Sequence, residues 1–169
     1  MKNLLFSLLV FLLSMSNSFG QGSFQDQNIS ILWECSPQMS QRQGNTVYYT
    51  CNYQKAGQVY IFSVSVNDIS KNLTQISSAR ETYISSFLAK VKEGVSSSGG
   101  KIISTGQILT QNSVQYSSTT RVDSELTLKE CTAAFIRGNN AYMVNLIGDV
   151  VNPKVESEFL TLVKSIRSN

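Results

Sequence analysis

Seven stretches of the chain carry the alternating or β-branched pattern of strands, and two others repeat apolar residues every three or four positions. The strand-like stretches are residues 31–35, 46–53, 58–67, 101–109, 113–122, 126–136 and 141–147. A period of two is typical of a half-buried strand, whereas a period of three to four is typical of an amphipathic helix. The sequence therefore predicts three strands, a helix, four strands and a second helix.

The two helical stretches also carry terminal signals. The first spans residues 76–95, and Ser78 and Glu81 have the spacing of a capping box at its start. The second spans residues 152–166, and Asn152 is placed to cap it just before a proline at the first helical position. Each helix must bury its apolar stripe against another element.

We therefore predict an α+β fold, in which two helices pack on one antiparallel sheet of six or seven strands, in the order βββ-α-ββββ-α. Two bulges are expected in this sheet. One is at Gly106, inside a strand, and the other lies between Leu128 and Cys131, where the apolar phase shifts. Gly138 and Asn139 are expected to form the turn of the last hairpin.

Residues 1–20 have the pattern of a secretory signal peptide. A lysine precedes about ten apolar residues, and a polar segment follows that ends with the small residues Ser18 and Gly20. Cleavage is expected before Gln21. The alternative is a membrane anchor, but the apolar run is about half the 20 residues that a spanning helix needs.

The mature chain should then have a flexible N-terminus at residues 21–27 and a single α+β domain at residues 28–169. No cysteine stands at the cleavage point, and no later stretch is apolar enough to span a membrane. We expect a soluble protein without a membrane span, secreted or periplasmic. The basic residues are scattered rather than clustered, which argues against nucleic acid as a partner.

Three cysteines, Cys35, Cys51 and Cys131, would lie in a compartment where disulfides persist. A hairpin folded about Gln43 would place Cys35 opposite Cys51 on the same face, within disulfide reach. The sequence thus favours a bridge between these two and a free Cys131. The alternative, three buried thiols, stays open because connectivity cannot be read from sequence.

Aromatic residues are concentrated in the first three strands, which fits either a ligand groove or core packing. Core packing is the favoured interpretation. The residues are Trp33, Tyr48, Tyr49, Tyr53, Tyr60 and Phe62. Tyr48 is the exception, because it falls on the face opposite to Tyr49 and Cys51, and we predict it as an exposed aromatic contact.

No catalytic, cofactor-binding or metal-binding residues are predicted, and no cofactor is expected. The chain contains no histidine, which excludes Ser-His-Asp and Cys-His devices and makes a zinc site unfavourable. Asp123 and Glu125 are close in sequence, but a solvated turn explains them. Asn28 and Asn72 stand in glycosylation sequons that matter only in a eukaryotic host.

The order of elements resembles the PsbP-like fold, which is shared by an extrinsic protein of photosystem II, a Ran-binding import factor and several bacterial exported proteins. The resemblance extends over the mature chain as a pattern. It is strongest in residues 131–136, which lead through a Gly-Asn turn to residues 141–146, and in the end of the last helix at residues 163–166. It implies a mostly non-enzymatic protein, and no functional residue of the family matches by position.

The leading hypothesis is an exported, non-enzymatic binding or accessory module with an unknown protein or small-molecule partner. A second hypothesis is a carrier of a small apolar ligand held between sheet and helices, in a cavity lined by residues such as Phe62, Phe87 and Tyr142. A third is an enzyme of unrecognised type, which predicts a cleft with convergent polar groups and a perturbed carboxylate or lysine.

Overall fold

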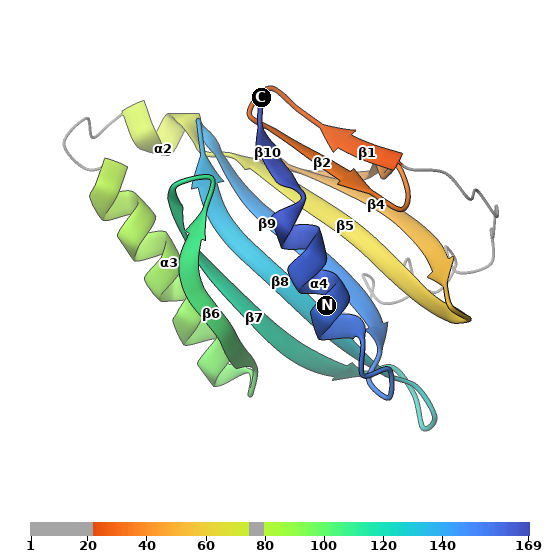
Figure 1. Cartoon of the computed structure of the whole chain (residues 1–169). Coiled ribbons are helices and arrows are strands. Elements are labelled where there is room, and N and C mark those ends of the chain that lie inside the picture. The colour runs from red at the N-terminus through yellow and green to blue at the C-terminus, as the bar shows by residue number, and fades with distance from the viewer. Residues whose placement is uncertain (1–21, 75–79) are drawn as a thin grey trace.

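The computed structural model describes residues 22–74 and 80–169, and this part of the chain is mostly β-structure, with strands in two sheets and three helices (Figure 1). The strands are β1 (Gly22–Gln25), β2 (Ile29–Trp33), β3 (Gln38–Gln43), β4 (Thr46–Lys55), β5 (Gln58–Asp68), β6 (Lys101–Ile108), β7 (Gln111–Arg121), β8 (Thr127–Arg137), β9 (Asn140–Asp149) and β10 (Ile166–Ser168). The helices are α2 (Ser70–Thr74), α3 (Arg80–Ser97) and α4 (Val155–Lys164).

The larger sheet has seven antiparallel strands in the order β3-β4-β5-β9-β8-β7-β6. It consists of two meanders, β3 to β5 and β6 to β9, which meet where β5 pairs with β9. Helices α2 and α3 connect the two meanders. The β8–β9 turn requires glycine at Gly138, because its φ is 57° and an added Cβ would lie 2.3 Å from Asn28 Oδ1.

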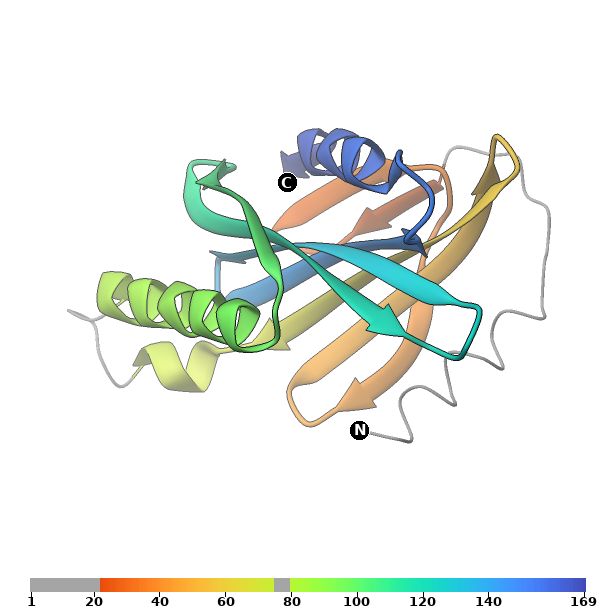
Figure 2. The same cartoon turned by 90° about the horizontal axis from the view of Figure 1, so that it is seen from below.

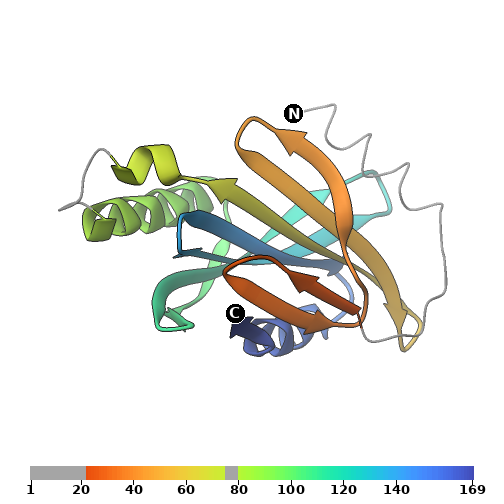
Figure 3. The same cartoon turned by 90° about the horizontal axis from the view of Figure 1, so that it is seen from above.

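The smaller sheet has three strands in the order β1-β2-β10 (Figures 1 and 3). It brings together two distant parts of the chain, because β10 follows α4 near the C-terminus and pairs with β2 near the N-terminus. Ile166 of β10 stands opposite Ile31 of β2, and both side chains are buried.

The two faces of the large sheet are covered differently. On one face, the small sheet and α4 enclose the main core. The largest fully buried side chains of this core are Tyr60, Tyr142, Phe62, Phe135, Phe159, Ile29, Ile31, Leu146 and Leu162. On the opposite face, α3 packs over β6, β7 and β8 and encloses a smaller core around Ile84 and Leu88 (Figure 2).

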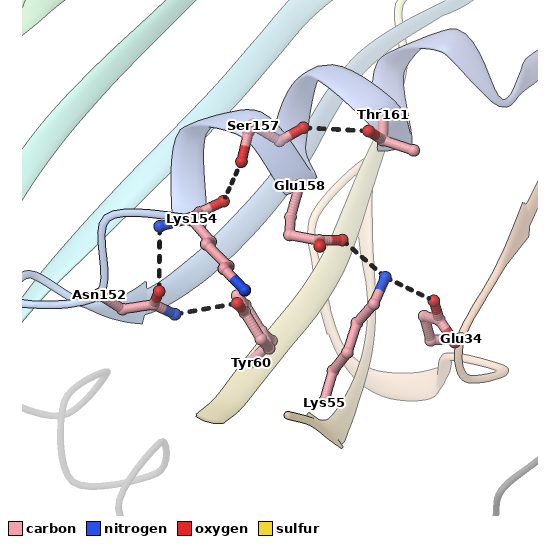
Figure 4. A network of polar contacts seen from close by, with 8 residues as sticks. All are labelled: Glu34, Lys55, Tyr60, Asn152, Lys154, Ser157, Glu158 and Thr161. Atoms are coloured by element: carbon pink, nitrogen blue, oxygen red, sulfur yellow. Dashed lines mark hydrogen bonds and ion pairs between the residues drawn. The ribbon is translucent and has the colours of Figure 1, made fainter. Parts of the chain in front are cut away.

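Polar contacts fix the start of α4 against the large sheet (Figure 4). Asn152 donates from its side-chain amide to the Tyr60 hydroxyl (2.9 Å) and accepts from the Lys154 backbone (3.0 Å). Lys55 forms ion pairs with Glu158 of α4 (2.9 Å) and with Glu34 (3.0 Å). These contacts hold the helix over the edge where β4 turns into β5.

The predicted two-helix α+β arrangement of the PsbP-like type is wrong. The described residues form a mostly β protein with a second sheet and with α2 as a third helix. Residues 31–35, expected in the main sheet, instead contribute to β2 of the small sheet. The second sheet was missed because β1 and β10 have only four and three residues, too short for a period to be recognised.

Several local features also differ from the predictions. Residues 22–25, inside the segment expected to be flexible, form β1. Helix α4 begins at Val155 and ends at Lys164, because Ile166 pairs in β10 instead of extending the helical stripe. Ser78 of the predicted capping box lies outside the described residues.

Both predicted bulges are misplaced. The register of β6 shifts between Ile102 and Ser104, whereas Gly106 pairs regularly with Ser113. Strand β8 has no shift against either neighbour. The alternation of apolar and polar residues is lost because residues 131–136 are buried on both faces of the sheet, so that apolar side chains occupy both faces there, with Thr132 as the exception.

The disulfide between Cys35 and Cys51 is present, as predicted, and Cys131 is a free, buried thiol. The hairpin from which it was predicted is wrong, however. Strand β4 pairs with β3 about a turn at Gly44 and Asn45, while Cys35 follows β2 of the other sheet. The disulfide therefore joins the two sheets. Within the described residues, no helix is long and apolar enough to cross a membrane.

Candidate functional site

Helix α3 covers only part of its face of the large sheet. It lies over β6, β7 and β8, whereas no helix of the described part of the chain lies over β4 and the adjoining half of β5 on this face (Figure 2). The boundary between the covered and uncovered parts runs close to β8 and β9. Side chains at this boundary are only partly packed, and this is where the site lies.

A pocket of about 420 Å³ opens between the C-terminal half of α3 and the sheet. We call it the α3 pocket. Its lining combines apolar side chains with a few polar groups, and comprises Phe87, Lys90, Val91, Gly94, Val95, Ser98, Tyr116, Ser118, Glu130 and Met143. This combination of an apolar wall with convergent polar groups is typical of small-molecule sites.

Glu130 is the carboxyl of this pocket. It projects from β8 opposite Ser118 of β7, is half-buried, and makes no hydrogen bond or ion pair within the described residues. Burial raises the pKa of the Glu130 carboxyl. Lys90 lines the same pocket without forming an ion pair with it. Glu130 is thus free to bond to a group that enters the pocket.

A row of polar side chains crosses the sheet next to Glu130. It passes through Thr132, which lies two residues after Glu130 on β8. The backbone register places these residues next to one another on five adjacent strands, and the polar row comprises Tyr116, Thr132, Asn145, Ser63 and Thr50. Asn145 donates to Ser63 Oγ at 3.1 Å, and the Thr50 hydroxyl lies 3.0 Å from that of Ser40. The polar row leads from the pocket onto the uncovered half of the sheet.

Two atoms of the polar row are buried without a hydrogen-bond partner among the described residues. They are Thr132 Oγ1 and Asn145 Oδ1, on adjacent strands. An unsatisfied buried polar group costs about 1–3 kcal/mol, and native proteins contain few of them. Trp33 Nε1 and Tyr53 Oη of the main core are unsatisfied in the same way. What distinguishes Thr132 and Asn145 is therefore their position beside the α3 pocket.

Tyr116 connects the pocket to the polar row. It lines the α3 pocket and stands opposite Thr132 in the backbone register. Burial raises the pKa of the Tyr116 phenol, and the charge of Glu130 adds to this rise. The phenol therefore stays protonated and can act as a hydrogen-bond donor.

The arrangement is suited to holding an amphipathic molecule. Phe87, Val91 and Met143 offer apolar contact, while Glu130 offers a hydrogen-bond acceptor when ionised. A ligand with an apolar body and an N–H or O–H donor would satisfy both. Within the described residues, no group of three or more cysteine or acidic side chains is placed to hold a metal ion.

The residues that the sequence predicted to line a ligand cavity or to form an aromatic contact lie on both faces of the large sheet. Phe87 lines the α3 pocket, but Phe62 and Tyr142 are fully buried in the core on the opposite face, so the cavity expected from these three residues together does not form. Tyr48 is half-buried on the α3 face, in register with Ser65, which in turn pairs with Met143. Its role as an aromatic contact stays a prediction.

Most of the other aromatic residues of the first strands lie in the core, as the favoured interpretation of core packing predicts. Trp33, Tyr60 and Phe62 are buried, and Tyr53 stacks on Tyr60 with ring centroids 5.2 Å apart. Asp123 accepts hydrogen bonds from the backbones of Glu125 and Leu126, which lowers the pKa of its carboxyl. It belongs to the β7–β8 turn.

Sequence reasoning missed Glu130, Thr132 and Asn145. Nothing in the sequence singled out the first two, because they share their predicted strand with the polar residues Thr127 and Lys129. In a strand of alternating pattern, polar residues are expected on a solvated face, whereas α3 lies over this part of the sheet and leaves both residues partly or fully buried. The position of α3 over β7 and β8 depends on tertiary packing, which local periodicity does not contain.

Comparison of the sequence with known protein families and with functionally described proteins finds no match. In structure, the chain is similar to a protein of Bacteroides thetaiotaomicron solved at 1.50 Å, with a TM-score of 0.46 and 9% identity, over 90% of this chain and 49% of that chain. The chain thus spans about half the length of that protein. None of these comparisons links the chain to the PsbP-like family.

Proposed function

We propose that this protein is an exported, non-enzymatic binding module, secreted or periplasmic, that holds a small amphipathic ligand in the α3 pocket. The observation that carries the proposal is the half-buried Glu130, which lines an apolar-walled pocket and has no side-chain partner among residues 22–74 and 80–169. A carboxyl in that position lowers stability unless a bound group compensates it. The ligand would place its apolar part against α3 and its donor group on Glu130.

Export is supported by two features of different kinds. Residues 1–20, which lie outside the described residues, have the composition of a signal peptide. The disulfide between Cys35 and Cys51 is of the kind that persists in oxidising compartments. Intact-mass measurement of the protein secreted by its host would test this part, because cleavage before Gln21 and the loss of two hydrogens are both expected.

Ligand binding can be tested with a fluorescent probe that has the expected chemistry. N-phenylnaphthylamine is neutral, apolar and carries one N–H donor, and its emission rises in apolar surroundings. We expect saturable binding to the mature protein. Replacement of Glu130 by alanine, which removes the acceptor but leaves the apolar wall, should weaken binding by about 10-fold or more, as loss of a hydrogen bond to a charged group does.

Gly94 offers a pocket-filling variant with a matched control. Gly94 lines the pocket and a Cβ added there meets nothing within 4 Å, so Gly94→Leu adds a bulky side chain at the pocket's lining without a clash at its Cβ. Ala89→Leu adds a similar side chain on an exposed position of the same helix. Probe binding should be lost in Gly94→Leu and retained in Ala89→Leu. Equal binding by both variants would contradict the proposal.

A second candidate function, acid catalysis, is favoured by one observation, the raised pKa of Glu130. A protonated carboxyl in an apolar pocket can act as a general acid. The two functions differ in what happens to a ligand copurified from the host. A binding module returns it unchanged after prolonged incubation, whereas an enzyme releases a product that mass spectrometry detects.

A further inference from the structure

A second pocket of about 420 Å³ lies at the opposite end of α3 from the α3 pocket. It is lined by the first turn of α3, by residues at the β6–β7 and β8–β9 turns, and by residues close to the chain's two described ends. Its lining is almost wholly polar, and comprises Gln27, Asn28, Arg80, Glu81, Gln111, Arg137, Gly138 and Asn169. We call it the arginine pocket.

Two guanidinium groups line the arginine pocket, and each is held in place by neutral groups. Arg80 Nη2 donates to the backbone oxygen of Gly138 at 2.6 Å. Arg137 donates to the Leu109 oxygen at 3.5 Å and to Ser168 Oγ at 3.0 Å. A guanidinium has five N–H donors, so several donors of each arginine have no protein acceptor in the described residues.

Neither guanidinium is neutralised. No carboxylate of the described residues forms an ion pair with Arg80 or Arg137, the α-carboxylate of Asn169 included. The lining residues carry two carboxylates, that of Glu81 and the α-carboxylate of Asn169, together with the two guanidinium groups, so that their formal charges balance. The N-terminus of the 18-residue helix α3 adds partial positive charge at the same place. An anion is therefore favoured by the N–H donors that the two arginines leave unused within the described residues, together with the start of α3.

We infer that the arginine pocket is a binding site for a small oxyanion, a carboxylate or a phosphate group carried by a small molecule. Guanidinium groups match these planar or tetrahedral oxyanions through paired N–H donors. The side-chain amides of Gln27 and Gln111 lie in the same lining and supply further donors. The carbonyls that hold Arg80 and Arg137 keep the two charges in position before the anion arrives, which lowers the entropy lost on binding.

Titration calorimetry of the mature protein tests this site, with inorganic phosphate and succinate as separate probes in a buffer of low ionic strength. Binding of at least one probe is expected, and it should weaken as salt is added. The lower of the two dissociation constants identifies whether the pocket prefers a phosphate or a carboxylate. If neither probe binds at millimolar concentration, the inference is overturned.

Three substitutions separate the pocket from general surface charge. Arg80→Gln should weaken binding about 10-fold or more, because it removes one of the two guanidinium groups. Arg121→Gln is the matched control, since Arg121 is exposed, also donates to a backbone oxygen (that of Asp123, 2.9 Å), and lies outside the pocket. Glu81→Gln should tighten binding about two- to fivefold by removing one of the two repelling carboxylates.

A folding control shows whether weaker anion binding by a variant is caused by loss of the native fold. Thermal unfolding of Arg80→Gln without anion should be cooperative, which shows that the pocket's surroundings persist. Equal weakening by Arg80→Gln and Arg121→Gln would place the binding on the general charge of the surface and overturn the inference. No effect of Glu81→Gln on affinity would place the anion away from the first turn of α3, with the same consequence.

Discussion

The sulfur of Cys35, two residues after β2, is bonded to that of Cys51 in the middle of β4, with the two Cα atoms 6.2 Å apart. The bond links the small sheet to the large one across the main core. Cys35 is buried and Cys51 is partly buried against the same core. Strand β3 lies between the two cysteines in sequence, so the bond also closes the loop that carries this edge strand.

Loss of this disulfide should destabilise the protein without changing its fold. The loop between the cysteines spans 16 positions, and a loop of about that length contributes about 3 kcal/mol through the entropy of the unfolded chain. The double variant Cys35→Ser/Cys51→Ser should therefore lose about 2–4 kcal/mol in urea unfolding. Reducing agent should lower the stability of the wild type to that of the variant and leave the variant unchanged.

The hydrogen bond between Asn152 and Tyr60 should contribute more than a surface contact, because both groups are buried. Asn152→Ala leaves the Tyr60 hydroxyl without its donor, which should cost about 1–3 kcal/mol. In a Tyr60→Phe background the same substitution should cost less, because no hydroxyl remains to be satisfied. A double-mutant cycle by urea unfolding measures the difference, and an equal cost in both backgrounds would contradict the assigned role.

The free thiol of Cys131 should be inert in the folded protein. It is fully buried on β8, and burial raises its pKa to about 11. At about pH 8 little thiolate is present, so labelling by iodoacetamide should be at least about 100-fold slower than in urea. Mass spectrometry follows the added mass. Rapid labelling under native conditions would show that β8 opens locally.

Glu130 should make stability depend on pH in a defined direction. Its folded-state pKa is raised by burial, so the folded protein binds this proton more tightly than the unfolded chain. The contribution of Glu130 to stability therefore falls as pH rises from about 4, the unfolded value, through the folded pKa. Glu130→Gln has no charge to bury.

The gain in unfolding free energy from Glu130→Gln should accordingly increase between about pH 4 and pH 7. Glu93→Gln, at an exposed position on α3, is the control and should show no such trend. A gain from Glu130→Gln that stays constant with pH would mean that the carboxyl is solvated in the folded protein.

The sequence allowed accurate prediction wherever local pattern and long-range packing agree. Strand β5 (Gln58–Asp68) was predicted at residues 58–67 because its β-branched and aromatic residues suit a central strand. The disulfide was predicted with the correct partners but from an incorrect hairpin. The partners were right because Cys35 and Cys51 both point into the main core, whichever sheet each strand joins.

The remaining errors arise from contacts between residues far apart in sequence. Strand β10 exists because Ile166 meets Ile31 across the small sheet, and nothing within three residues specifies a strand. The candidate site was missed for the same reason. The residues next to Glu130 in sequence do not indicate that it is buried. Only the placement of α3 over β7 and β8 makes it a partly buried group in a pocket.

Methyl NMR of methionine gives the most direct test of the proposed ligand site. From Gln21 onward the chain has two methionines, Met39 and Met143. Met143 lines the α3 pocket, whereas Met39 lies exposed on the edge strand β3. In protein labelled with carbon-13 at the methionine methyl groups, N-phenylnaphthylamine should shift the Met143 signal and leave that of Met39 in place. A saturable shift of Met39 alone, or no shift of either signal during binding, would contradict the account.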